Sequence, residues 1–110
     1  SAVRKEIFME ERNILVLKKP LKVDGEELKE LPYDFESMTA GNMLSATRDM
    51  VAAGFPRASL QEFDADLHLF LFAKAVEIAT KEKVSVPDVM RLSAADAIKG
   101  GTLARNFFFL

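Results

Sequence analysis

The feature that most constrains this 110-residue chain is a helical run that is apolar on two sides. Its apolar residues recur at helical spacing in two stripes instead of one. The first stripe contains Leu60, Phe63, Leu67, Phe70, Leu71 and Ile78, and the second contains Leu69, Phe72, Val76 and Ala79. A helix that is apolar on most sides is buried on most sides. The pattern therefore predicts a central helix, either of the fold or of an oligomer.

The predicted limits of this helix follow from its flanks. Ser59 and Glu62 form a Ser-x-x-Glu pattern, which is typical of a capping box at a helix N-terminus. We expect the helix to run from there to about Lys81. Lys74 and Glu77 interrupt its most apolar stretch, whereas a membrane span needs about 20 largely apolar residues. We therefore expect no membrane partner and, because a signal-peptide pattern is absent, a cytoplasmic location.

The sequence before this helix has the pattern of a β-hairpin over residues 13–31. A β-type run, Asn-Ile-Leu-Val-Leu, is followed by Lys18-Lys19-Pro20, where the proline suits a strand edge or a break because it lacks an N–H. Asp24-Gly25 is a strong signal for a two-residue hairpin turn. Leu28 and Leu31 then fall on the returning strand.

Three further helices are predicted from their capping residues. Thr39 is a plausible N-cap for a helix near 40–53, which Gly54 and Pro56 would end. Ser85 and Ser93 repeat the capping pattern and predict short helices near 86–91 and 94–99. We expect Gly100-Gly101 to break or end the last of these.

Together these patterns predict an α+β fold that is mostly α, in which an N-terminal β-hairpin precedes a compact bundle of four to five helices. The length suits one domain. We expect residues 13–110 to form it, with the hairpin at 13–31 and the helical part at 39–110. Residues 1–12 are expected to form a flexible N-terminal arm, or a strand contributed by Ile7 and Phe8.

Catalytic and metal chemistry have little basis in this sequence. There is no cysteine, so thiolate catalysis and zinc–thiolate sites are excluded. The single histidine, His68, lies near Glu62, Asp64 and Asp66, but acids in the first turns of a helix are explained by its dipole. No nucleophile elbow or phosphate-binding loop is present. We therefore predict no catalytic residue, no metal site, no cofactor and no enzymatic activity.

The charge balance argues against a nucleic-acid partner. Lys plus Arg is 15 and Asp plus Glu is 17, whereas phosphate neutralisation needs clustered cations. The predicted helices near 86–91 and 94–99 could be taken for a helix-turn-helix pair. They carry only Arg91 and Lys99 against Asp88 and Asp96, which predicts weak phosphate binding. A small helical regulatory or DNA-associated domain therefore remains only the alternative function.

A protein partner is the better prediction, because the sequence ends in Phe107-Phe108-Phe109-Leu110. Four consecutive large apolar residues cannot all face inward from one helix or strand. They either close the core or form a contact surface, and aromatic residues dominate interface hot spots. With the central helix they give six candidate protein-binding residues: Phe70, Phe72, Phe107, Phe108, Phe109 and Leu110.

A second route to association is the outer edge of the hairpin. Its unpaired N–H and C=O groups could recruit a strand from another chain, or Lys18, Lys19 and Lys22 could block such pairing. These two readings of the edge stay open, and the surplus of apolar residues leads us to expect a homo-oligomer.

The order of these elements resembles the phage tail assembly chaperones of Mu-like and related long-tailed phages and prophages. The similarity lies in the opening Ile14–Leu31, where a strand with Lys-Pro leads to a Gly turn and a return strand. It continues in the helix start Met38-Thr39-Ala40-Gly41-Asn42-Met43-Leu44, where Asn42 stands in place of the commoner acid. A compact helical remainder with an apolar end completes the pattern, so the resemblance covers most of residues 13–110.

This resemblance implies a non-enzymatic function in virion morphogenesis. Proteins of this family are thought to hold the tape measure protein before the tail tube polymerises around it. The implied partners are the tape measure protein, a second copy of the chain and, as a further option, the tail tube protein. The implied location is the bacterial host cytoplasm, with no place in the mature virion.

Overall fold

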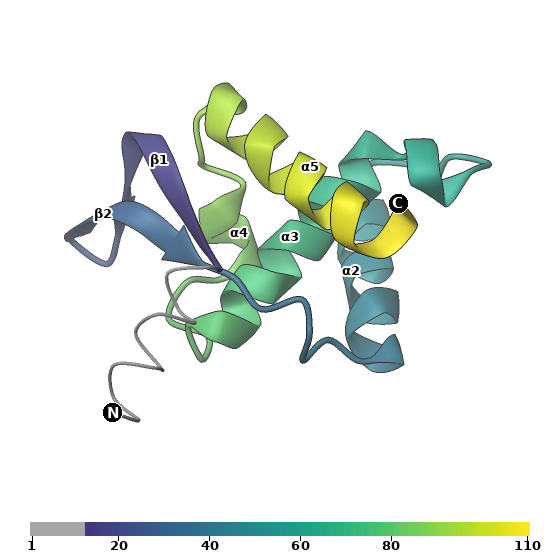
Figure 1. The fold of residues 1–110 in the computed structure, drawn as a ribbon, viewed down its shortest axis with the longest axis horizontal. Coiled ribbons are helices and arrows are strands. Elements are labelled where there is room, and N and C mark those ends of the chain that lie inside the picture. Colours follow the sequence, from purple (N-terminus) through teal and green to yellow (C-terminus); the bar gives the residue numbers. More distant parts are fainter. Residues whose placement is uncertain (1–12) are drawn as a thin grey trace.

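The computed structural model describes residues 13–110, and the predictions for residues 1–12 lie outside this range. A two-stranded antiparallel hairpin comes first and four helices follow, as predicted (Figure 1). The elements are β1 (Ile14–Val23), β2 (Glu26–Pro32), α2 (Ala40–Ala52), the short 3-10 helix η1 (Gln61–Phe63), α3 (Ala65–Ala79), α4 (Val86–Val89) and α5 (Ala94–Phe109). The predicted α+β class with a dominant helical part is confirmed.

Helix α3 lies at the centre of the molecule, with the hairpin on one side and α2 on the other (Figure 1). It packs against α2, α4 and α5 and also contacts β2. Leu71, Phe72, Ala73, Ala75 and Val76 are completely buried on it. The prediction of a central helix buried on most sides is confirmed, and the other elements of the same chain bury it.

The turn of the hairpin is the predicted one. Asp24 and Gly25 both have positive φ, 50° and 80°, which is the geometry of a tight turn matched to the strand twist. Inward-facing residues of β1 are Leu15, Leu17, Leu21 and Val23, all buried. The pairing shifts between Val16 and Leu21, so residues 17–20 lie opposite Lys29 alone. The predicted break at Lys18-Lys19-Pro20 is therefore a bulge within one continuous strand.

A buried carboxylate of α5 fixes this bulge. Asp96 has no exposed surface, and it accepts hydrogen bonds from the backbone N–H of Lys18 (2.9 and 3.1 Å) and of Lys19 (3.1 Å). The Ser93 hydroxyl donates to it at 2.8 Å. Burial opposes the charge, but these hydrogen bonds outweigh it and hold the pKa of Asp96 below its usual value. The hairpin is thereby attached to the start of α5.

The predicted start of the central helix was wrong. Asp64, not Ser59, is the N-cap of α3, and its carboxylate accepts from Leu67 N at 3.1 Å. The second oxygen of Asp64 accepts from Ala58 N at 3.1 Å, which holds the preceding segment in place. The predictions for Thr39, Ser85 and Ser93 are confirmed, since each side chain accepts from a backbone N–H three residues later.

The predicted end of the last helix was also wrong. Helix α5 continues through Gly100-Gly101 to Phe109, whereas α4 is shorter than predicted. The reason is tertiary packing, because a Cβ at Gly100 would lie 2.5 Å from Cδ2 of Phe72. The missing side chain lets α5 approach α3 closely, and this contact offsets the low helix propensity of glycine.

Candidate protein-binding surfaces

The structure divides the six predicted binding residues into three groups. Phe72 is completely buried beneath α5, and Phe70 is buried beside Phe55 at a ring distance of 6.3 Å. These two side chains contribute to the core, and Phe70 also lines the groove between α2 and α4 that is described below. Phe108 and Phe109 are half-buried against the core, and Phe107 and Leu110 are exposed.

The aromatic run at the end of α5 therefore both closes the core and reaches solvent. Phe108 meets Phe35 edge-on at 5.5 Å, and Phe109 lies 5.3 Å from the ring of His68. Phe107 stacks on Phe35 at 5.2 Å but keeps 45% of its surface exposed, and Leu110 keeps 78%. The helical geometry explains the split, because consecutive residues of a helix point about 100° apart.

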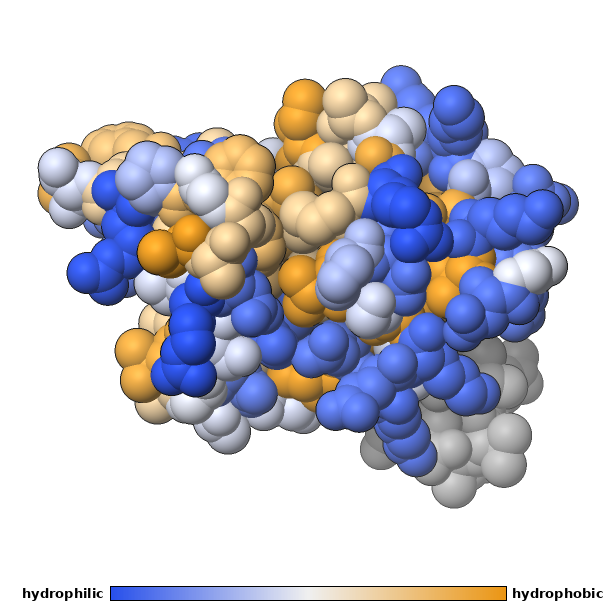
Figure 2. Space-filling view, turned by 180° about the vertical axis from the view of Figure 1, so that it is seen from behind, coloured by the Kyte–Doolittle hydropathy of each residue, from blue (hydrophilic) through white to orange (hydrophobic). Residues whose placement is uncertain are grey.

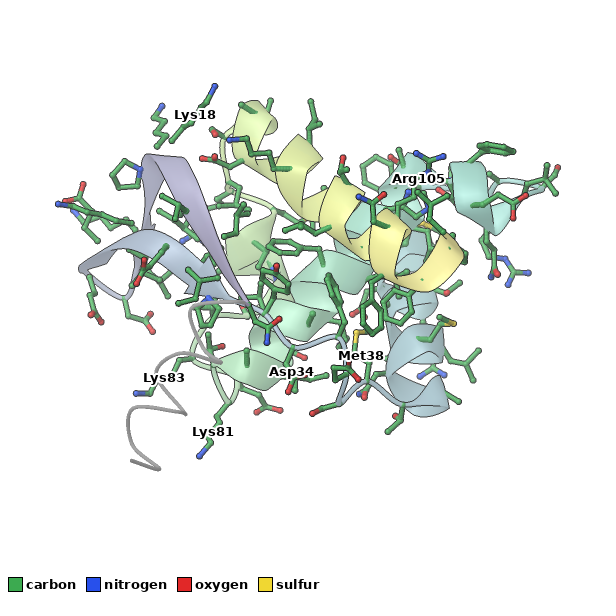
Figure 3. All side chains as sticks on the ribbon, viewed as in Figure 1. Lys18, Asp34, Met38, Lys81, Lys83 and Arg105 are labelled. Carbon is green, nitrogen blue, oxygen red and sulfur yellow. The ribbon has the colours of Figure 1, made fainter. Side chains whose placement is uncertain are left out.

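A second exposed apolar group adjoins the end of α5. It comes from the segment before α3, where Phe55, Leu60 and Phe63 are exposed. Arg105 Nε donates to Glu62 O at 3.3 Å, and Leu60 and Phe109 line one hollow, so the two groups belong to the same end of the molecule (Figures 1 and 3). We call Phe55, Leu60, Phe63, Phe107 and Leu110 the apolar end.

The apolar end was only partly predicted. Leu60 and Phe63 were assigned to the buried stripe of the central helix, and Phe55 was given no role. Recognising Asp64 as the N-cap would have separated Leu60 and Phe63 from that helix, since residues before an N-cap do not share its periodicity. Large apolar residues on a segment outside the buried stripe are the signal that the sequence offered.

The rear face of the molecule carries more apolar surface. Figure 2 shows hydrophobic side chains gathered over the half that holds α2 and the segment before α3, and continuing toward the centre. Leu44 and Val51, seven residues apart on α2, are also exposed. Monomeric proteins rarely expose large contiguous apolar patches, so such surface favours a protein contact.

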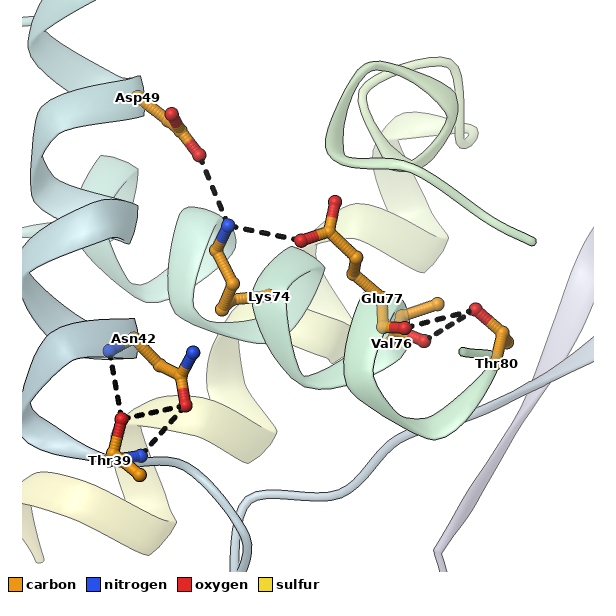
Figure 4. Close-up of polar contacts among 7 residues, drawn as sticks. All are labelled: Thr39, Asn42, Asp49, Lys74, Val76, Glu77 and Thr80. Carbon is orange, nitrogen blue, oxygen red and sulfur yellow. Dashed lines mark hydrogen bonds and ion pairs between the residues drawn. The ribbon is translucent and has the colours of Figure 1, made fainter. Parts of the chain in front are cut away.

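A groove of about 620 Å³ lies between α2 and α4, with α3 as its floor. Its lining is Asp49, Ala52, Ala53, Phe70, Lys74, Glu77, Val86, Pro87 and Met90. Lys74 Nζ lies 3.1 Å from Oε1 of Glu77 and 3.5 Å from Oδ2 of Asp49 (Figure 4). We call it the α2–α4 groove.

The predicted structural explanation of the acids near His68 agrees with their geometry. Asp64 caps α3, and Nε2 of His68 lies 2.9 Å from Gln61 O, within the buried end of that helix. Within residues 13–110, no three side chains among His, Asp and Glu gather into a group that could hold a metal ion.

Two titratable groups elsewhere in the fold have shifted pKa values. Hydrogen bonds from Ser85 and Arg91 hold the pKa of Asp88 below its usual value, and burial raises the pKa of Tyr33.

The outer edge of β1 is not free along its whole length. Asp96 takes up the N–H groups of Lys18 and Lys19, and the Arg91 guanidinium donates to Lys22 O. Lys18, Lys19 and Lys22 thus lie at a stretch of strand that α5 and the segment before it already cover.

No known protein family, curated protein or solved structure matches this chain. In the described part of the chain, no helix combines the length and the apolar character that crossing a membrane requires. The features that bear on its function are therefore the surfaces described above and the sequence pattern of residues 14–44.

Proposed function

We propose that this protein is a non-enzymatic phage tail assembly chaperone that binds the tape measure protein during tail morphogenesis. The observation that carries the proposal is the apolar end, where five large apolar side chains are exposed on one end of a folded domain. The resemblance of Ile14–Leu31 and Met38–Leu44 to that family supplies the identity of the client.

The physical requirements of this role fit the surface. A chaperone that holds a long helical client must cover apolar side chains of that client until the tail tube replaces it. Aromatic and aliphatic residues held on a rigid scaffold suit this task, because they bury apolar area at a low cost in side-chain entropy. The net charge of −2 gives no strong field that would direct the protein to nucleic acid.

The same surface supports a proposed homo-oligomer. Apolar area that later covers a client can be covered beforehand by a second copy, and the two contacts then compete by mass action. The tail tube protein is a further proposed partner on the resemblance alone.

The alternative of a DNA-associated domain gains no support from α4 and α5. Arg91 donates to Asp88 Oδ1 at 2.7 Å and also to Lys22 O, so its guanidinium is already engaged within the protein. Salt-dependent binding to random duplex DNA would revive this alternative.

The test is co-expression with the tape measure protein of the same phage or prophage. We expect a stable complex, and we expect Leu60→Ser with Phe63→Ser to weaken it at least tenfold. Val16→Ser is the control, because Val16 is equally exposed but lies on the hairpin. If the two proteins never co-purify, and tails form normally without this protein, the proposed function is wrong.

A further inference from the structure

The α2–α4 groove has two apolar walls that the fold itself leaves uncovered. Ala52 and Ala53 at the end of α2 form one wall and are exposed. Val86, Pro87 and Met90 of α4 and its C-cap form the other, and Met90 is 37% exposed. Phe70 closes the floor. A groove of this volume and lining is typical of sites that receive apolar side chains.

The charges of the groove are unbalanced. Lys74 is 10% exposed and already contacts two carboxylates, those of Asp49 and Glu77. Three charged groups therefore carry one excess negative charge. The side chain of Asp49 is 40% exposed, and Lys74 Nζ lies 3.5 Å from its Oδ2, so this carboxylate can accept a further donor from outside. The groove is complementary to an apolar segment that also carries a cation.

The walls further determine the kind of segment. Both are helix ends whose N–H groups are already paired, as in Ala53 N to Asp49 O at 3.0 Å and Met90 N to Val86 O at 3.2 Å. A partner strand would find no free edge to extend. A helix satisfies its own backbone and presents only side chains, so it fits between such walls.

We infer that the α2–α4 groove binds an amphipathic helix of the tape measure protein. An apolar side chain of that helix lies between Ala53 and Met90, and a Lys or Arg of the same helix pairs with Asp49. This assignment rests on the proposed function and locates one contact of the client away from the apolar end.

The test compares charge pairs in the groove and outside it, with the full-length chain and the full-length tape measure protein. Met90→Lys and Met90→Glu remove the same apolar contact but add opposite charges. Ala53→Lys and Ala53→Glu repeat the comparison on the other wall, so that a folding defect at one position does not decide the result. Ile98→Lys and Ile98→Glu are the controls, since Ile98 is 69% exposed on α5 and does not line the groove.

We expect each groove lysine to raise the Kd at least tenfold, each groove glutamate to raise it at most threefold, and neither Ile98 variant to change it more than twofold. Equal effects of Lys and Glu would overturn the cationic partner, and unchanged binding by all four groove variants would overturn the groove. If the unsubstituted chain does not bind the tape measure protein at all, the proposed function itself fails.

Discussion

The two ends of helix α5 are built in opposite ways. At its start, Ser93 and Asp96 are buried or half-buried, and Asp96 is used fully by the N-cap and by the bulge of β1. At its end, Phe107 and Leu110 leave large apolar surfaces in solvent. The first arrangement stabilises the fold and has nothing left to offer a partner. The second adds little to stability and leaves apolar surface exposed, so the two ends separate residues that stabilise the fold from residues that we propose for binding.

The largest expected effect on stability comes from substituting Asp96 at the start of α5. Replacing it with alanine leaves the part-buried N–H groups of Lys18 and Lys19 without their acceptor, and a donor that loses its partner away from water costs about 1–3 kcal/mol. We expect Asp96→Ala to lower the free energy of unfolding by roughly 3–5 kcal/mol, as measured by urea denaturation. Asp96→Asn keeps one acceptor oxygen and should lose less. Equal stability of Asp96→Ala and the parent chain would show that the bulge does not depend on this carboxylate.

The middle of α5 gives a matched pair of glycines. A Cβ at Gly100 would lie 2.5 Å from the buried Phe72 ring, whereas at Gly101 the nearest atom, Leu69 N, is 3.7 Å away. We expect Gly100→Ala to destabilise by about 1–3 kcal/mol through overpacking. Gly101→Ala should be neutral or stabilise by up to about 1 kcal/mol, because alanine favours the helix. The Tm of each variant in thermal unfolding tests this difference, and equal shifts in Tm would contradict the close contact with Phe72.

These glycines also show what the sequence could and could not predict. The hairpin, its turn and the caps at Thr39, Ser85 and Ser93 depend on local chemistry, and all were predicted correctly. Gly100-Gly101 was predicted to end a helix, because local propensity is all that a single sequence displays there. Glycine is required at position 100 only because Phe72, which is distant in the chain, packs closely against it.

The candidate surfaces divide along the same line. Phe107 and Leu110 were named from an apolar run that no single helix face could bury, which is a local argument. The α2–α4 groove was not predicted, because Asp49, Lys74 and Met90 come together only when three helices pack. Ser59 was predicted as the N-cap in place of Asp64, and this error placed Leu60 and Phe63 inside the central helix.

The start of α5 should also respond to acid. The pKa of Asp96 lies below its usual value in the folded protein, so the folded state favours the carboxylate. Its contribution to stability is fully present above the unfolded pKa, which is about 3.9, and is lost as the pH falls through the lowered folded value. We expect the stability difference between the parent chain and Asp96→Asn to shrink from pH 5 to pH 2 in urea titrations. A constant difference over this range would contradict the lowered pKa.

The smallest expected effect on folding lies at the other end of the helix. Phe107→Ser and Leu110→Ser remove side chains that are 45% and 78% exposed. We expect Leu110→Ser to change the free energy of unfolding by less than about 0.5 kcal/mol. Phe107→Ser should change it by less than about 1 kcal/mol, the larger limit because Phe107 also stacks on Phe35. Phe109→Ser is the matched control, because Phe109 packs against the core and His68 and should cost more. The solution mass of each variant and its binding to the tape measure protein then distinguish a role in binding from a role in the core. A smaller oligomer, or loss of the tape measure protein, at unchanged Tm would assign Phe107 and Leu110 to binding. Unfolding by Leu110→Ser would assign the whole end of α5 to the core and remove the contrast between its two ends.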